Sequence, residues 1–190
     1  MKKEIFRKSF HIIFGIIFLS LIHFFGTDNS FWIILTCFLI GLIIALLHRN
    51  GFKIPLLEKI IFTVEREHEK HFPGKAALLF FIAAIILLYF FKNYEIIVLA
   101  SLAVEVFADA GAALVGKRFG KHKIFQKEHY TKTVEGTSAC FVIALIVLLF
   151  FFSWPIALIG AITATIFEFV PINDNLLVPL STAGILKLLL

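Results

Sequence analysis

The chain alternates between long apolar runs and short polar stretches. Seven segments are almost entirely apolar: Phe10–Phe25, Phe31–Leu47, Ala76–Phe91, Ile96–Val115, Ser138–Phe152, Pro155–Phe169 and Leu176–Leu190. Such runs predict helices, and a series of them predicts a bundle of membrane-spanning helices. Several are shorter than the roughly 20 residues that a spanning helix needs, so we expect them either to extend into flanking polar residues or to cross a thin bilayer.

The polar stretch between the second and third runs holds one further pattern. Pro55–Val64 places its leucine, isoleucine and valine side chains on one helical face, which predicts a short interfacial amphipathic helix. The charged run Glu65–His71 follows and is expected to be mostly solvated, with Glu65, Arg66 and Glu67 as the candidate exceptions. Trp154 and Pro155, where the sixth run begins, can close a tight turn between the fifth and sixth runs.

Composition supports the same class. Hydrophobic residues make up 60% of the 190 residues, charged residues 16%, and the mean hydropathy is +0.97. A water-soluble fold cannot bury so much apolar surface. We therefore predict an all-α, polytopic membrane protein of about seven spanning helices, with residues 1–190 as one domain. Cys37 and Cys140 lie in apolar runs, so neither a disulfide nor a zinc site is expected, and no nucleic-acid partner is expected.

The basic residues predict the orientation. If the N-terminus is cytoplasmic, all of the 18 lysines and arginines except Lys92 and Lys187 fall on the cytoplasmic side. The positive-inside rule then favours a cell-membrane protein with a cytoplasmic N-terminus and, after seven spans, an external C-terminus. Any single lysine on this face can also serve as an anchor to anionic lipid headgroups.

Two carboxylates interrupt the fourth apolar run. Glu105 and Asp109 are four residues apart, so they share one face of a helix. An ionisable residue at bilayer depth is costly unless it is paired, bound to a metal or facing water. The pair therefore marks a candidate functional site.

A polar stripe opens the first helix. Glu4, Arg7, Lys8, His11 and Gly15 recur at intervals of one to four residues and occupy one helical face, which predicts that the stripe faces protein and not lipid. His11 is either a satisfied buried histidine or a group that binds phosphate or carries a proton.

Two later clusters suit phosphate. GAALVGK at 111–117 matches part of a Walker A motif, but Arg118 replaces the required serine or threonine and no strand precedes it. We expect a glycine-rich loop there that brings backbone N–H groups to an anion. The glycines and cations of this loop are Gly116, Lys117, Gly120 and Lys121, and the second cluster is Lys132, Thr133, Glu135 and Gly136. Thr133 and Glu135 also fit a plain helix N-cap and first turn.

Taken together, these clusters resemble the CTP-dependent lipid-alcohol kinases, the family that includes dolichol kinase and phytol kinase. The matching patterns are Glu4-x-x-Arg7-Lys8-x-x-His11-x-x-x-Gly15, Asp109-Ala110-x-Ala112-x-x-x-Gly116-x-x-x-Gly120-Lys121, Lys132-Thr133-x-Glu135-Gly136, and Asp174-Asn175-Leu176 after Glu168. The part from the aspartate onward also resembles the phosphatidate cytidylyltransferases.

The resemblance implies transfer of the γ-phosphate of CTP to the terminal hydroxyl of an isoprenoid alcohol of dolichol, polyprenol or phytol type. It implies Mg²⁺ at Asp109, with Glu105 and Asp174 as further metal candidates, and a triphosphate held by the basic and glycine clusters together with Arg7, Lys8 and Asn175. Glu135, His11 and Asp174 are the candidate bases, in no order. Asp174 and Asn175 also fit a plain turn before the last helix.

Two other functions stay open. A cytidylyltransferase would transfer CMP to a phosphatidate-like lipid and release pyrophosphate, with the same metal and phosphate contacts. A non-enzymatic membrane protein or transporter would use Glu105 and Asp109 to relay ions, and would leave the glycine and lysine clusters without a role.

Overall fold

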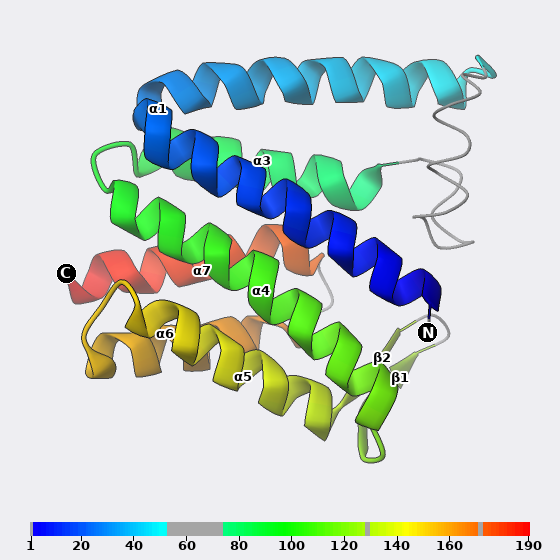
Figure 1. Ribbon diagram of the computed structural model, residues 1–190, viewed down its shortest axis with the longest axis vertical. Helices are drawn as coiled ribbons and strands as arrows, with labels where there is room; N and C mark the ends of the chain where they lie inside the picture. Colours follow the sequence, from blue (N-terminus) through cyan, green and yellow to red (C-terminus); the bar gives the residue numbers. More distant parts are fainter. Residues whose placement is uncertain (1, 53–73, 128–129, 171–172) are drawn as a thin grey trace.

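The structure is a computed structural model that describes residues 2–52, 74–127, 130–170 and 173–190 (Figure 1). Its elements are α1 (Lys2–Arg49), α3 (Lys75–Phe90), α4 (Glu95–Phe119), β1 (Lys123–Lys127), β2 (Tyr130–Thr133), α5 (Val134–Leu149), α6 (Trp154–Phe167) and α7 (Asp174–Leu189). The predicted all-α class is confirmed, and the antiparallel hairpin of β1 and β2 is an addition that the sequence analysis missed. The predicted amphipathic helix Pro55–Val64 and the run Glu65–His71 lie outside the described residues.

The first two apolar runs form the two arms of α1. Gly26 has φ 72° and ψ 173°, so the helix breaks there and the second arm folds back along the bundle (Figure 1). A positive φ of this kind is open to glycine at little cost. Thr27 Oγ1 donates to the Lys92 carbonyl at 2.8 Å, and Ser30 Oγ donates to the Leu21 carbonyl at 3.0 Å. The Ser30 bond spans the break within α1, and the Thr27 bond ties the bend to the turn before α4.

The other apolar runs form α3 to α7, with ends that shift by a few residues. Within the described ranges, α1 and α4 alone are long and apolar enough to cross a membrane by length and composition, and most of the apolar window of α4 is buried inside the protein. α3 and α5 have 16 residues each and α6 has 14, so at 1.5 Å per residue they reach about 21–24 Å, short of the ~30 Å hydrocarbon core. Length therefore supports fewer spans than the seven predicted.

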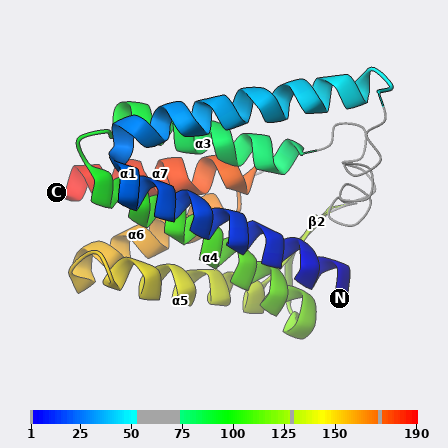
Figure 2. The ribbon, with the colours of Figure 1, turned by 45° about the horizontal axis from the view of Figure 1, so that its top comes forward.

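α4 occupies the middle of the bundle. Around it lie, in order and each in contact with the next, α1, α3, α7, α6 and α5 (Figures 1 and 2). α4 itself packs against α1, α5 and α7. The described helices share one hydrophobic core, to which all of them contribute. Pro155 lies in the first turn of α6, where its missing N–H costs no helical hydrogen bond.

The helices alternate in direction, so the polar clusters converge. The N-terminus and the β hairpin lie at one end of the bundle, whereas the C-terminus lies at the other (Figure 2). At the C-terminal end, the Lys187 ammonium stands 3.4 Å from the centre of the Tyr94 ring. Lys187 therefore lies at the end of the bundle opposite the N-terminus and the hairpin.

Glycine permits the close approach of α1 to α4. A Cβ at Gly15 would lie 2.3 and 2.5 Å from the two methyl groups of Val106. The valine side chain is short and branched at Cβ, so these methyl groups cannot move aside. This contact sets the depth of the N-terminal arm against the central helix.

We expect Gly15→Ala to lower the free energy of unfolding by about 1–3 kcal/mol, because the added methyl group overpacks the contact with Val106. The matched control is Gly184→Ala in α7, where a Cβ would meet nothing within 4 Å. Thermal unfolding in detergent should show a lower Tm for Gly15→Ala and an unchanged or higher Tm for the control. Equal Tm values in the two variants would contradict this account of the α1–α4 contact.

Candidate functional site

A cavity of about 440 Å³ opens at the polar end of the bundle. Five helices and the β hairpin contribute to its wall. The lining residues are Glu4, Arg7, Lys8, Asp109, Ala112, Ala113, Gly116, Lys117, Gly120, Lys123, Thr131, Lys132, Thr133, Gly136, Glu168 and Asp174. Most of the predicted site residues thus meet in one place, although they come from segments that span almost the whole chain.

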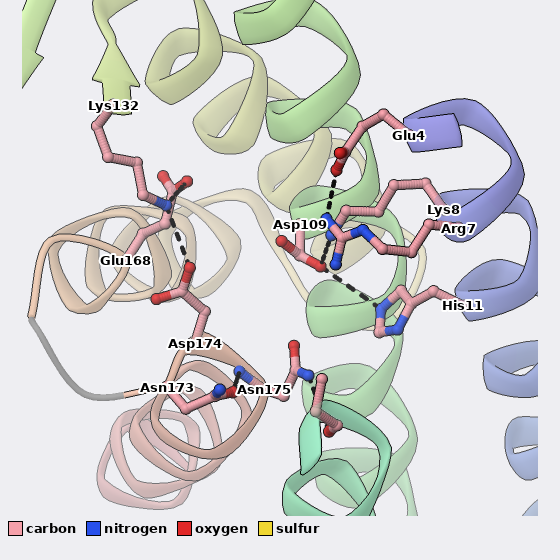
Figure 3. A network of polar contacts seen from close by, with 11 residues as sticks. Glu4, Arg7, Lys8, His11, Asp109, Lys132, Glu168, Asn173, Asp174 and Asn175 are labelled. Carbon is pink, nitrogen blue, oxygen red and sulfur yellow. Dashed lines mark hydrogen bonds and ion pairs between the residues drawn. The ribbon is translucent and has the colours of Figure 1, made fainter. Parts of the chain in front are cut away.

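One side of the cavity is an ion pair between α1 and α4. The Lys8 ammonium bonds to Oδ2 of Asp109, and the Lys8 side chain is only 4% exposed (Figure 3). His11 approaches the same carboxylate oxygen, with Nε2 3.7 Å away, and its ring packs edge-on against Phe80. The stripe predicted on the first helix therefore faces the carboxylates of α4.

Glu105 lies one turn before Asp109 and is fully buried. Neither of its carboxylate oxygens has a hydrogen-bond partner. Ligand atoms of His11, Glu105 and Asp109 lie within 4.8 Å of one another. A buried carboxylate without a partner is costly, and a cation between these three groups would satisfy it. The two carboxylates therefore fit Mg²⁺, which prefers oxygen ligands. Asp174, the third metal candidate, does not belong to this group.

A second pair of contacts closes the outer edge of the same wall. Glu4 accepts from the Arg7 guanidinium and, through its other oxygen, from the Lys117 ammonium at 3.3 Å. The Lys117 side chain is 50% exposed, so it remains accessible to a ligand that enters from water. These contacts join the first turns of α1 to the last turn of α4.

The opposite wall is centred on Lys132. This lysine extends from β2 toward the end of α6 and the start of α7, where its ammonium bonds to Glu168 and lies 3.2 Å from Oδ2 of Asp174 (Figure 3). Burial raises the pKa of the Asp174 carboxyl to about 6, although the Lys132 ammonium acts in the opposite direction. Asp174 therefore changes protonation close to neutral pH.

Opposite charges are nearly balanced around the cavity. Its wall carries five basic side chains, Arg7, Lys8, Lys117, Lys123 and Lys132, and four acidic ones, Glu4, Asp109, Glu168 and Asp174. Such a wall suits a ligand that brings both an anion and a cation, because each finds its counter-charge there.

Gly116 does not lie in the loop that the sequence analysis expected. It belongs to α4, and Gly120, which follows the helix, donates its N–H to the Gly116 carbonyl at 3.0 Å. A Cβ at Gly136 would lie 3.1 Å from the Gly116 Cα, and a Cβ at Gly116 would lie 3.1 Å from Thr133 Oγ1. These glycines let α4 and α5 meet with their backbones nearly in contact, and they leave the cavity open where side chains would fill it.

Thr133 and Glu135 serve as the cap and first turn of α5. Thr133 Oγ1 accepts from the Gly136 N–H at 3.2 Å. Glu135 is absent from the cavity wall, and its carboxylate instead bonds to the ring of His122 at 2.8 Å and to the His122 backbone N–H at 3.3 Å. Bonds from its own backbone N–H and from His122 lower the pKa of the Glu135 carboxyl to about 2. The structure thus does not place this candidate base at the site.

Lys121 and Asn175 also lie away from the cavity wall. Lys121 is exposed beside the start of the hairpin. The Asn175 amide donates to the Ala76 carbonyl at 2.9 Å and so connects α7 to the first turn of α3, while Asn173 caps α7 by accepting from the Asn175 N–H. Both residues thus stand near helix ends, and their assignment to the triphosphate stays a prediction.

Two carboxylates to which the sequence analysis assigned no role lie at the site. Glu168 and Glu4 are both buried, and both bond to basic side chains of the cavity. Glu168 ends an apolar run in the way that Glu105 interrupts one, so the cost of a carboxylate at bilayer depth was the signal that could have found it.

A protein of Methanocaldococcus jannaschii, the uncharacterized protein MJ1137, is 29% identical to this chain over 188 residues, which cover 97% of this chain and 93% of the relative. No family model and no solved structure matches the chain. Because the similarity covers nearly the whole chain, the helices that build the cavity fall within it.

Lys132→Met should make stability more dependent on pH. Without the ammonium, the pKa of Asp174 rises further. When folding raises the pKa of a carboxyl, the free energy of unfolding falls as the pH rises from the unfolded-state pKa to the folded-state pKa. Each additional pKa unit lowers the free energy of unfolding above that range by about 1.4 kcal/mol. We expect the variant to lose more Tm at pH 8 than at pH 5, relative to the wild type, in EDTA.

Lys121→Met is the matched control for this measurement, because it removes the same charge from an exposed position off the cavity wall. Its Tm should follow the wild type at both pH values. An equal loss of Tm at pH 5 and pH 8 in Lys132→Met would show that Lys132 acts by packing alone.

Proposed function

We propose that this chain is an integral membrane enzyme of the cell membrane that transfers the γ-phosphate of CTP to the terminal hydroxyl of an isoprenoid alcohol. The observation that carries the proposal is the cavity, where basic side chains and carboxylates from both halves of the chain meet at one end of an apolar helix bundle. Three features support it: the surface of the bundle, the charges of the cavity and the groups available for catalysis.

The surface of the bundle supports a membrane location. Large hydrophobic side chains stand exposed on every described helix, including Phe24, Phe90, Ile96, Ile146 and Leu188, and several of them are more than half exposed. Soluble monomers rarely expose continuous apolar surface of this extent. We propose that the seven apolar runs cross a bilayer, with shorter helices extended by their polar ends and with the cavity on the cytoplasmic face.

The cavity charges support a polyphosphate ligand. Lys8, Lys132 and Arg7 are part-buried cations that do not depend on bulk water for their orientation, since carboxylates hold each of them in place. Phosphoryl transfer requires mainly positioning and neutralisation of charge. CTP as the donor rests on the resemblance of the motifs to the lipid-alcohol kinases.

Asp109 and Glu105 would hold Mg²⁺, which supplies neutralisation of the triphosphate charge when bound. The lysines would orient the triphosphate between the two walls. Asp174 fits the role of general base, because its pKa of about 6 lies close to the operating pH. In this scheme the hydroxyl proton passes to the Asp174 carboxylate, the alcohol oxygen bonds to the γ-phosphorus, and the bond from that phosphorus to the β-phosphate bridge breaks and leaves CDP.

The isoprenoid chain would lie among the apolar side chains of the helices or against lipid, with its hydroxyl at the cavity. A membrane location suits this acceptor, because a soluble enzyme would have to extract the chain from the bilayer.

The direct test incubates detergent-purified protein with Mg²⁺, γ-labelled CTP and a panel of phytol, geranylgeraniol, longer polyprenols and diacylglycerol. We expect label in the lipid phase with an isoprenoid alcohol. Pyrophosphate release on addition of phosphatidate, without labelled lipid, would favour the cytidylyltransferase instead. Absence of both products would leave the ion-relay function.

Asp109→Asn should lower kcat by about a hundredfold or more, because contacts to charge that develops in the transition state are worth ~10²–10³ in rate. The change removes one negative charge and keeps the shape of the side chain. Activity would be compared with the wild type after size-exclusion chromatography and circular dichroism have shown that the variant is folded. Wild-type kcat in a folded Asp109→Asn protein would exclude Asp109 as a metal ligand.

A further inference from the structure

Asp109 takes part in two arrangements at once, because it bonds to Lys8 and also belongs to the group of possible metal ligands with His11 and Glu105. Oδ2 of Asp109 already bonds to the Lys8 ammonium, and the same oxygen is the one that His11 Nε2 faces at 3.7 Å. Behind it, both Glu105 oxygens lack a hydrogen-bond partner. One carboxylate of the cluster is therefore paired with a side chain, whereas the other has no hydrogen-bond partner.

The charges of this cluster do not cancel when both carboxylates are ionised. Asp109 and Glu105 carry two negative charges, whereas Lys8 supplies one positive charge. A divalent cation would neutralise both carboxylates. Their oxygen ligands suit Mg²⁺, and the added imidazole nitrogen of His11 makes Mn²⁺ the better match. An uncompensated buried charge is costly, so neutralisation of both carboxylates would favour binding of the cation.

Lys8 also lines the cavity. If a metal ion binds Asp109, the Lys8 ammonium loses its carboxylate partner and remains at the cavity wall. There it can form a new ion pair with a bound anion. Release of Lys8 therefore couples the cation cluster to the cavity.

We infer that Lys8 is an exchangeable occupant of the metal site. A divalent cation displaces its ammonium from Asp109 and binds His11, Glu105 and Asp109, and the freed ammonium then binds a phosphate of the incoming polyphosphate. Metal and polyphosphate consequently bind with positive coupling, and each binds weakly alone. This inference deepens the proposed function, on which the identity of the polyphosphate rests, but the exchange itself is measured with the metal alone.

The test measures Mn²⁺ binding to purified protein in detergent, without nucleotide, from the loss of the free Mn²⁺ signal in electron paramagnetic resonance. Lys8→Gln removes the competing ammonium, so Mn²⁺ should bind about tenfold more tightly than to the wild type, since breaking a buried pair leaves an uncompensated carboxylate. Glu105→Gln should weaken Mn²⁺ binding in both the wild-type and the Lys8→Gln background.

Lys117→Gln is the matched control. It removes the same charge from the same cavity, but Lys117 is half exposed and pairs with Glu4. Because exposed charges are screened, Mn²⁺ affinity should change by less than about twofold. A gain in Lys117→Gln equal to that in Lys8→Gln would reduce the effect to general electrostatics and overturn the exchange.

A second measurement covers the case in which Lys8→Gln does not fold. Asp109→Asn frees Lys8 without a metal, so metal-free tripolyphosphate in EDTA should bind this variant more tightly than the wild type in calorimetry. Unchanged or weaker tripolyphosphate binding in folded Asp109→Asn would overturn the exchange, as would unchanged Mn²⁺ affinity in folded Lys8→Gln.

These outcomes are separable from failure of the kinase assay. Tighter Mn²⁺ binding in Lys8→Gln supports the exchange even if no lipid is phosphorylated, and then the polyphosphate has another identity. Labelled lipid together with unchanged Mn²⁺ affinity in Lys8→Gln supports the kinase and overturns the exchange.

Discussion

The cost of burying carboxylates in an apolar bundle is the constraint on which the polar end of this molecule depends. Both carboxylates lie on the central helix, where Glu105 is fully buried and Asp109 is half-buried at the cavity wall. The Lys8 ammonium on α1 pairs with Asp109, and this ion pair joins the beginning of the chain to its middle. Glu105 has no such partner, so a bound cation would satisfy a group that the protein itself leaves unpaired.

The same constraint recurs across the cavity. Glu168 ends α6 and Asp174 begins α7, and Lys132 reaches both from the hairpin. The hairpin therefore has a structural purpose: its register, with Phe125 opposite Lys132 and an irregularity beside Lys123, positions Lys132 between two helix ends. Close contact of Gly116 with Gly136 brings α4 and α5 near enough for the two walls to share one cavity.

Hydrophobic runs and isolated carboxylates predicted much of this arrangement. The apolar runs predicted the helices, and the spacing of Lys8 and His11 predicted which face of the first helix meets Asp109. Other features depend on tertiary contacts that periodicity does not contain. Thr133 and Glu135 matched a motif, yet in the structure Thr133 caps α5 and Glu135 bonds to His122. The hairpin was missed because its strands are short, and the position of Gly116 inside α4 was missed because a glycine favours a loop in isolation.

Balanced charge around the cavity has a consequence for ligand selection. A wall of five basic and four acidic side chains attracts a free polyphosphate only weakly, since most of its cations already have carboxylates beside them. In the proposed exchange, a polyphosphate that arrives with a divalent cation would meet a different surface, because the cation would bind carboxylates and release ammonium groups to the phosphates. Ligand selection would then depend on exchange of partners within the wall and not on its net charge. The unsatisfied Glu105 carboxylate favours this exchange in the direction of the bound cation.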